Sequence, residues 1–83
     1  MEIYELTSRY DARKSFYHKA IVKIDGTVKR LYSYETLVAW IDEDGAHVKA
    51  LHSATTTRHI KEFLKQHGFK ADSGKQMIND YPA

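Results

Sequence analysis

Two polar blocks contain the residues of this chain whose types could carry out chemistry. One is the S-Y-E-T segment at residues 33–36, and the other is the T-T-T-R-H segment at residues 55–59. His59 is the candidate for a general base, because an unperturbed imidazole titrates close to neutral pH. No pattern in the sequence supplies it with a nucleophile or with an acid that would orient its ring. We therefore expect no enzymatic activity and no catalytic residue.

The two blocks also have a structural interpretation. If the start of a helix packs beside the turn that holds residues 33–35, Arg58 can form an ion pair with Glu35. We interpret such a pair as structural, with threonines capping the helix and Arg58 holding the turn. The predicted polar cluster comprises Tyr34, Glu35, Thr36, Thr57, Arg58 and His59.

The sequence contains no residue pattern typical of a metal site or a cofactor site. The five histidines include no H-E-x-x-H spacing, and His59 and His67 are two helical turns apart. The four glycines are explained by turns or helix ends rather than by a phosphate-binding loop. We expect no metal, no cofactor and no small-molecule substrate.

The charge of the chain is unevenly distributed although the net charge is only +2. Basic residues are in excess in residues 1–30 and 53–83, whereas residues 31–52 are acidic. Cations interleaved with aromatic rings can follow a phosphate backbone and stack on bases. The candidate nucleic-acid-binding residues are Arg9, Arg13, Lys14, Tyr17, Arg58, Lys61 and Lys65. The alternative for the N-terminal ones is a solvated segment anchored to a sheet by its aromatic side chains.

The aromatic content indicates a protein-binding surface. One tryptophan and six tyrosines are more than one small core can bury with their polar atoms satisfied. Partly exposed Tyr and Trp side chains suit protein interfaces. We predict that Tyr32, Tyr34 and Trp40 contact an unknown protein partner or a second copy of the chain, as a homodimer.

One amphipathic helix is among the elements that we expect to position these residues. Ile60, Phe63, Leu64 and His67 recur at helical spacing, and the residues between them are mostly charged. Ser53, Thr55 and Thr56 are all candidates for the N-cap, and the sequence does not choose among them. Gly68 is suited to close the helix, with Phe69 then touching Leu64. A helix of about twelve residues is marginal alone, so this apolar stripe must rest on another element.

That element is predicted to be a four-stranded antiparallel meander within residues 17–52. We expect strands at residues 19–24, 27–32, 36–41 and 46–51, with a hairpin turn at Asp25 and Gly26 and a second turn at residues 33–35. Simple alternation places Leu37 on one face of the third strand and Val38 with Trp40 on the other. The fold class is α+β, with the helix packed on one sheet face and a short helical turn near the C-terminus.

The size of the chain indicates one small domain. Eighty-three residues suffice for a single core, here residues 1–83 with a leader segment at 1–15 and a tail at 72–83. The absence of cysteine excludes disulfides and thiolate metal sites and suits a reducing compartment. No segment is predicted to span a membrane or to act as a signal peptide, so we expect a cytoplasmic protein that does not bind membranes.

Three blocks of the chain carry a resemblance to a known family. They are K-S-F-Y-H-K-A at residues 14–20, L-Y-S-Y-E-T-L-V-A at residues 31–39 and S-A-T-T-T-R-H-I-K-E-F-L at residues 53–64. They resemble the pattern K-S-F-Y-G-K-A, L-x-S-Y-[DE]-T-x-V-A and S-A-T-T-x-R-H-I-x-x-F-L of a family of small uncharacterised proteins of Firmicutes and their phages and mobile elements. His18 stands where that pattern has glycine. The family is a domain of unknown function, so the resemblance implies no catalytic residues.

Two functional classes follow from these observations. The leading hypothesis is a non-enzymatic protein-interaction module of phage or mobile-element origin, which works through an exposed sheet face. The alternative is a nucleic-acid-binding accessory protein that uses the basic aromatic N-terminal segment and the helix.

Overall fold

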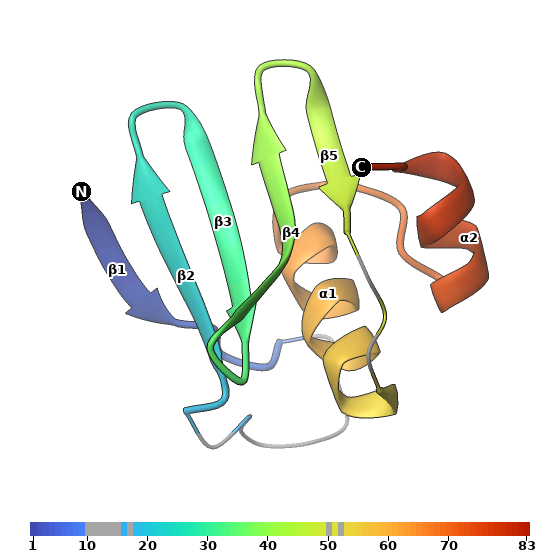
Figure 1. Cartoon of the computed structure of the whole chain (residues 1–83), viewed down its shortest axis with the longest axis horizontal. Coiled ribbons are helices and arrows are strands. Elements are labelled where there is room, and N and C mark those ends of the chain that lie inside the picture. The colour runs from blue at the N-terminus through green and yellow to red at the C-terminus, as the bar shows by residue number, and fades with distance from the viewer. Residues whose placement is uncertain (10–15, 17, 50, 52) are drawn as a thin grey trace.

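The computed structural model describes residues 1–9, 16, 18–49, 51 and 53–83 of the chain. These residues form one antiparallel sheet and two helices (Figure 1). The α+β class and the antiparallel sheet predicted from the sequence are confirmed.

The sheet is a meander of five strands rather than the four predicted. Its strands pair in chain order and each pair is antiparallel. They are β1 (Glu2–Glu5), β2 (Ala20–Asp25), β3 (Val28–Ser33), β4 (Thr36–Asp42) and β5 (Gly45–Val48). The additional strand, β1, lies inside the predicted leader segment and pairs with β2. It has only four residues and its partner is distant in the sequence, so no local turn signal marks it.

The hairpin turn between β2 and β3 lies one residue later than predicted. Asp25 pairs with Val28, so the two turn residues are Gly26 and Thr27. Gly26 has φ +62°, a conformation in which a side chain would be strained. The predicted glycine is therefore the essential turn residue, although its place in the turn differs.

A β-bulge changes which side chains of β4 share a face. Leu31 pairs with Ala39 and Tyr32 with Leu37, which leaves Val38 as an extra residue between them. Val38 and Ala39 are consequently both buried, and the predicted grouping of Val38 with Trp40 is wrong. Leu37 instead joins Trp40 on the other side of the sheet, where both side chains are half-buried.

The first helix, α1 (Ala54–Gln66), has the ends that the sequence indicates. Ser53 is the N-cap, and its hydroxyl accepts a hydrogen bond from the amide of Thr56 at 3.1 Å. At the other end Gly68 has φ +83°, and the amide of Phe69 donates to the carbonyl of Leu64 at 2.9 Å. These bonds satisfy backbone groups that a helix leaves unpaired at its termini.

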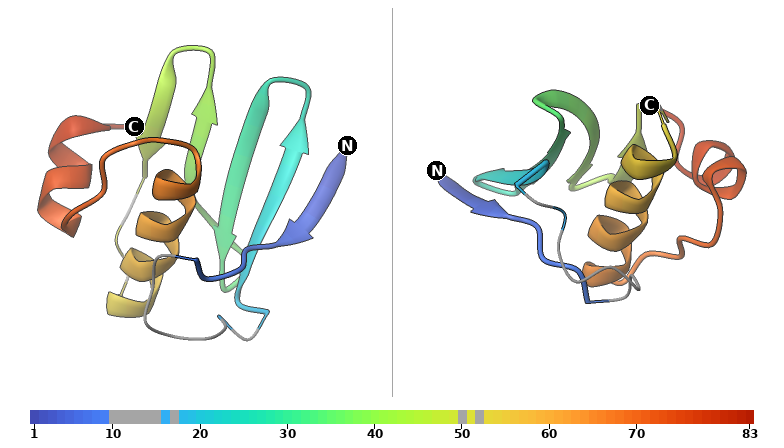
Figure 2. Two further views of the ribbon diagram at one scale, coloured as in Figure 1. Left: turned by 180° about the vertical axis from the view of Figure 1, so that it is seen from behind. Right: turned by 90° about the horizontal axis from the view of Figure 1, so that it is seen from below.

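The apolar stripe of α1 supplies the centre of the core. Ile60, Phe63 and Leu64 are fully buried, and α1 packs against β3 and β4. Figure 2 shows α1 on one side of the sheet, with no helix on the other side. Neither described helix is long and apolar enough to cross a membrane.

The second helix, α2 (Gly74–Asp80), lies in the C-terminal tail, and the residues that follow it contact the last strand. Ser73 caps it by accepting a hydrogen bond from the amide of Gln76 at 3.1 Å, and Met77 is fully buried. Beyond the helix, the amide of Val48 donates to the carbonyl of Tyr81 at 2.7 Å, and Val48 forms a parallel bridge with Pro82. The tail therefore pairs with the last residue of β5 at the outer edge of the sheet.

Truncation of the central core residue should unfold much of the population. We expect Phe63→Ala to lower the free energy of unfolding by about 3–5 kcal/mol, because it removes a fully buried ring and leaves a cavity. Urea unfolding followed by circular dichroism measures the change. Lys65→Ala, on the half-exposed side of the same helix, should change it by less than about 0.5 kcal/mol. Similar losses for both variants would contradict the proposed packing.

Candidate functional site

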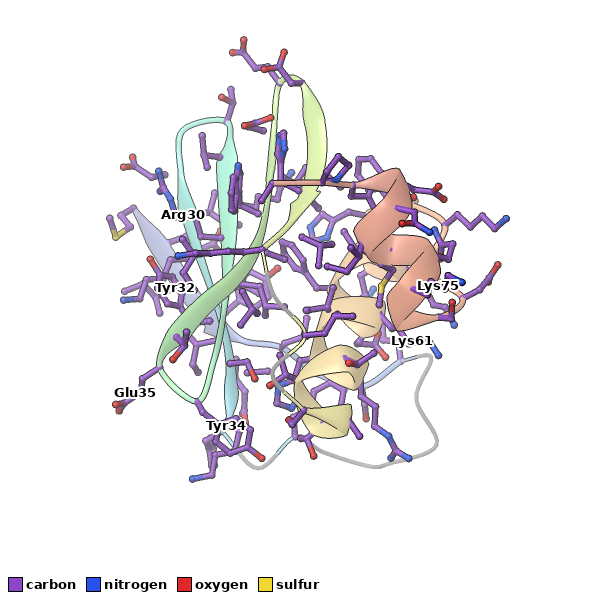
Figure 3. The ribbon with its side chains drawn as sticks, turned by 45° about the vertical axis from the view of Figure 1, so that its right-hand side comes forward. Arg30, Tyr32, Tyr34, Glu35, Lys61 and Lys75 are labelled. Carbon is purple, nitrogen blue, oxygen red and sulfur yellow. The ribbon has the colours of Figure 1, made fainter. Side chains whose placement is uncertain are left out.

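The sheet face opposite α1 carries a mixture of aromatic, aliphatic and basic side chains. In β2 and β3 the buried residues alternate with half-buried ones, so alternate side chains point away from the core. We call this side the open face, and it carries Ile21, Lys23, Arg30, Tyr32, Leu37 and Trp40. No described helix covers it. In Figure 3, Arg30 and Tyr32 project from the sheet, whereas Lys61 and Lys75 lie on the helical side of the molecule.

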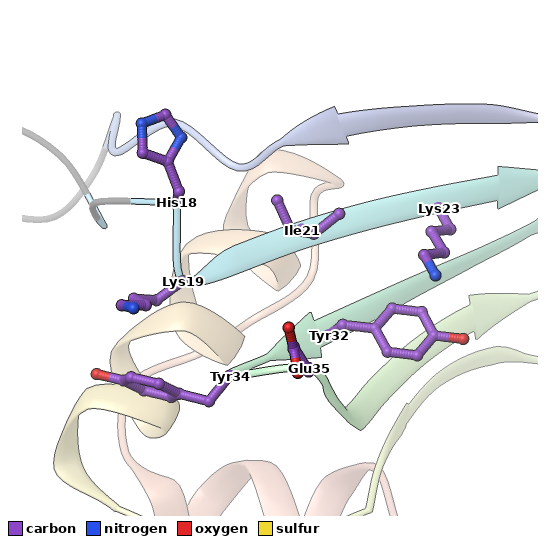
Figure 4. Close-up of a pocket in the computed structure, with 7 residues that line it drawn as sticks. All are labelled: His18, Lys19, Ile21, Lys23, Tyr32, Tyr34 and Glu35. Atoms are coloured by element: carbon purple, nitrogen blue, oxygen red, sulfur yellow. The ribbon is translucent and has the colours of Figure 1, made fainter.

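Two hollows lined by described residues lie on the open face. The larger, here named the β2–β3 groove, has a volume of about 650 Å³ (Figure 4). It is lined by His18, Lys19, Ile21, Lys23, Tyr32, Tyr34 and Glu35. A smaller hollow of about 230 Å³ lies beside it and is lined by Val28, Arg30, Leu37, Trp40 and Asp42.

Two lysines lie over tyrosine rings in the β2–β3 groove. The Nζ atom of Lys23 is 4.6 Å from the ring centroid of Tyr32, and that of Lys19 is 5.9 Å from the ring centroid of Tyr34. An ammonium group within about 6 Å of an aromatic centroid is attracted by the ring. The groove therefore presents two cation–aromatic pairs, one at each lysine.

Backbone strain is concentrated at the same groove. Among the described residues, the non-glycine positions with positive φ are His18 (+64°), Tyr34 (+50°) and Glu35 (+69°), and all three line the groove. Tyr34 and Glu35 are the two turn residues between β3 and β4, since Ser33 pairs with Thr36. Such a turn favours Asn-Gly, because each ordinary residue in the left-handed conformation costs about 1 kcal/mol or more.

Contacts with Glu5 hold the strained conformation of His18. The carboxylate of Glu5 accepts a hydrogen bond from the backbone amide of His18 at 2.7 Å and lies 3.0 Å from its Nδ1 atom. The positive φ also gives a physical reason for glycine at this position in the pattern that the chain resembles.

A buried polar cluster lies at the end of β3, directly before the strained turn. The hydroxyl of Ser33 is 2.8 Å from Nδ1 of His59 and 3.0 Å from the hydroxyl of Thr56. Ser33 and Thr56 are each only 2% exposed and His59 is fully buried. The ring of His59 contacts that of Phe16 edge-on, with centroids 4.7 Å apart, and its centroid is 6.0 Å from that of Tyr34. This cluster ties the start of α1 to the base of the β3–β4 turn.

A serine beside a histidine has the composition of a nucleophile and its base. Here both side chains are enclosed, so a substrate cannot reach the hydroxyl of Ser33 without opening the core. The cluster positions the turn. Sequence reasoning missed Ser33 as the partner of His59, although its place on the core-facing side of β3, two residues after Leu31, was the available signal.

A second set of contacts surrounds Trp40. Its ring stacks on His47 with centroids 5.1 Å apart and an angle of 21° between the ring planes. The Nε2 atom of His47 is 3.0 Å from Oδ1 of Asp42. The hydrogen bond with His47 lowers the pKa of the Asp42 carboxyl, and the amide of Asp44 assists, while partial desolvation opposes this shift.

The three side chains predicted to bind protein all lie on or beside the open face. Tyr32 and Tyr34 line the β2–β3 groove, and Trp40 lines the smaller hollow. Tyr34 is 51% exposed, which makes it one of the large hydrophobic residues most accessible to a partner.

Three described members of the predicted nucleic-acid-binding set lie on α1 rather than on the open face. Arg13, Lys14 and Tyr17 lie outside the described residues, and Arg9 is exposed. Arg58, Lys61 and Lys65 follow helical spacing along α1, on the side away from its buried stripe. They therefore lie on a different surface from the groove.

The predicted polar cluster forms only in part. Tyr34 and His59 approach one another as expected. The ion pairs between described residues do not include one between Arg58 and Glu35, and both side chains are exposed. Thr57 contributes to the helix start, where its hydroxyl donates to the carbonyl of Ser53 at 3.0 Å. Arg58 therefore does not hold the turn; the buried hydroxyls and His59 do.

Removal of the Ser33 hydroxyl should destabilise the fold. We expect Ser33→Ala to lower the free energy of unfolding by about 1–3 kcal/mol, because it removes the hydroxyl that joins Thr56 to His59 in the core. Urea unfolding gives the value. Thr7→Ala, at an exposed position, should cost less than about 0.5 kcal/mol, and an equal effect of the two changes would disprove the structural role of the cluster.

Acidification should weaken the contacts around Trp40. The folded pKa of Asp42 lies below its ordinary value, so its stabilising contribution is complete above about pH 4 and is lost as the pH falls through the folded pKa. We expect Asp42→Asn to lose less stability than the original chain between roughly pH 5 and pH 2, as measured by thermal unfolding across that range. A loss of stability in Asp42→Asn equal to that of the original chain over this range would contradict the role of the Asp42 carboxylate.

Comparisons with known proteins identify a family without a known activity. No curated protein and no solved structure matches the chain. A family model described as a family of unknown function (DUF8033) matches residues 4–79. The expectation of an uncharacterised family is thus confirmed, while the Firmicutes and phage origin stays a prediction. The chain belongs to the DUF8033 family, whose function is unknown.

Proposed function

We propose that this protein is a non-enzymatic protein-interaction module, a cytoplasmic accessory factor of a phage or mobile element, that binds its partner through the open face. The β2–β3 groove is the centre of this binding surface. The observation that carries the proposal is the strain at His18, Tyr34 and Glu35, the three described non-glycine residues with positive φ, which all line that groove.

Strain at a groove indicates that its side chains have a purpose beyond folding. Asn and Gly in place of Tyr34 and Glu35 would form the same turn at lower free energy. The chain instead has a large ring and a carboxylate there, both exposed. Residues in unfavourable backbone conformations concentrate at binding sites, where the surrounding structure enforces them. Here the buried contacts of Ser33 supply that enforcement.

The side chains of the open face suit a protein partner. Tyr and Trp bury a large area on binding while losing few rotatable bonds, and they are enriched at the centres of interfaces. Tyr32 is steadied by Lys23, and Trp40 is stacked on His47. These rings are therefore ordered before a partner arrives, which lowers the entropy lost on binding.

The charge of the open face favours protein over nucleic acid. Its cations Lys19, Lys23 and Arg30 are offset by the carboxylates of Glu5, Asp25, Glu35 and Asp42. A surface that tracks a phosphate backbone needs an excess of positive charge. Three cations of the alternative set, Arg58, Lys61 and Lys65, lie on α1 instead, and Figure 3 shows Lys61 on the helical side, away from Tyr32 and Tyr34.

A double substitution in the β3–β4 turn separates binding from folding. We expect Tyr34→Asn with Glu35→Gly to raise the free energy of unfolding by about 1–2 kcal/mol, because it relieves strain at two positions. The same variant should lose its partner, because the groove loses two lining side chains. Thermal unfolding measures the first effect. Affinity capture from extracts of the native host, with half of each sample treated with nuclease, measures the second.

The turn between β4 and β5 offers a matched control. Glu43→Asn with Asp44→Gly makes the same kind of change at the far end of the sheet (Figure 1) and should leave partner capture intact. If the variant with Tyr34→Asn and Glu35→Gly captures as much partner as the original chain, the groove is not the binding site. A nuclease-sensitive complex would favour the nucleic-acid alternative, and recovery of the chain itself alone would favour a homodimer.

A further inference from the structure

We infer that the β2–β3 groove binds an extended acidic peptide segment of the partner, with two carboxylates that reach Lys19 and Lys23 and an apolar side chain between them. This inference rests on the proposed function and specifies the chemistry of the partner. Its starting point is the order of side chains along β2, where Ile21 lies between the two lysines on the same face.

The spacing of the lysines matches that of an extended peptide. Lys19 continues the geometry of β2, because its carbonyl accepts a hydrogen bond from the amide of Tyr34 at 2.9 Å. Lys19 and Lys23 are four residues apart, so their Cα atoms are separated by about 13 Å at about 3.3 Å per residue. An extended peptide has the same rise and also presents alternate side chains on one face. Acidic residues at positions 1 and 5 of a peptide, with an apolar residue at position 3, therefore fall over Lys19, Lys23 and Ile21.

The two ammonium groups are held in place for this task. Each lies over a tyrosine ring, at 4.6 Å for Lys23 and 5.9 Å for Lys19, which restricts flexible side chains. An ammonium over a ring still has N–H groups that can donate to a carboxylate. A peptide that covers the groove also excludes water from these pairs and so strengthens their attraction.

The carboxylate of Glu35 distinguishes a peptide from a polyphosphate. It lines the same groove as the lysines and is exposed. A nucleic acid would bring phosphates against it at short and regular intervals, whereas a peptide carries its carboxylates only where its sequence places them. A peptide also has backbone N–H groups, which can donate hydrogen bonds to the carboxylate of Glu35.

The test is an NMR titration of the full ¹⁵N-labelled chain with defined probes. The first probe is the acetylated and amidated peptide Ala-Glu-Thr-Val-Thr-Glu-Ala, which has the inferred spacing. We expect its addition to shift the amide signals of Lys19, Lys23, Tyr32 and Tyr34 and to leave those of α2 unchanged. The peptide Ala-Thr-Glu-Val-Glu-Thr-Ala, with the carboxylates closer together, should bind less tightly.

Variants with matched charge test the two lysines. Lys19→Gln with Lys23→Gln should weaken binding of the first peptide by about tenfold or more, because two charge pairs are lost. Lys49→Gln with Lys70→Gln removes the same charge from exposed positions outside the groove and should leave the affinity within about twofold. Equal weakening by both variants would show a non-specific charge effect and would overturn the inference.

Three further outcomes would also overturn it. One is the absence of shifts at millimolar peptide, and another is tighter binding of single-stranded oligothymidylate to the groove. The third is a set of groove shifts that depend on protein concentration without peptide, which would make a second copy the occupant. If the peptide fails while the Tyr34 and Glu35 variant still loses its cellular partner, the groove remains the binding site and only its acidic ligand is wrong.

Discussion

One helix can cover only one face of a sheet, and the rest of this structure follows from that geometric constraint. The sheet has five strands, and the buried stripe of α1 rests on one face of it, against β3 and β4. The core therefore forms on a single side, where side chains of the strands nearest α1, among them Leu31, Val38 and Ala39, are enclosed. The side chains of the second face, the open face, remain partly accessible to solvent. Aromatic and aliphatic residues on that second face are not needed for the core, which is why we assign them to recognition.

The buried hydroxyls of Ser33 and Thr56, together with His59, connect the two halves of the molecule. They join the first turn of α1 to the last residue of β3, where an apolar contact would have allowed more sliding. Hydrogen bonds between buried polar groups are directional, and leaving one unmade is costly. The cluster thus fixes the end of β3 closely enough to keep Tyr34 and Glu35 in a conformation that they would not adopt alone. The same side chains that invite comparison with a catalytic pair hold the proposed binding surface in shape.

The extent to which sequence predicted this structure depends on how local each signal is. Short patterns of apolar spacing and glycine predict the stripe and C-terminal end of α1 and the four strands from β2 to β5, apart from their exact ends. For the N-cap of α1, the sequence leaves three hydroxyl residues open, of which the structure selects Ser53. β1 was missed because four residues with a distant partner carry no such pattern. The bulge at Val38 was missed because a register shift depends on the neighbouring strand. The groove was out of reach for a related reason. Its shape comes from Tyr34 and Glu35 in a conformation that their types disfavour, so propensity argues against it.

The two outer edges of the sheet differ in a way that bears on self-association. At the end of β5, the position beside Val48 is already occupied by Tyr81 and Pro82, and proline has no N–H to offer a further strand. In β1 the backbone N–H and C=O groups of Ile3 point away from β2. Leu6 is hydrogen-bonded to Ala20, and every second residue of an antiparallel strand makes such bonds, so Tyr4 and Glu2 face β2 and Ile3 does not. The tail therefore hinders the addition of a strand at the Val48 end of β5, whereas Ile3 in β1 directs its backbone groups outward. Strand pairing between two copies would thus be favoured at β1 over that end of β5.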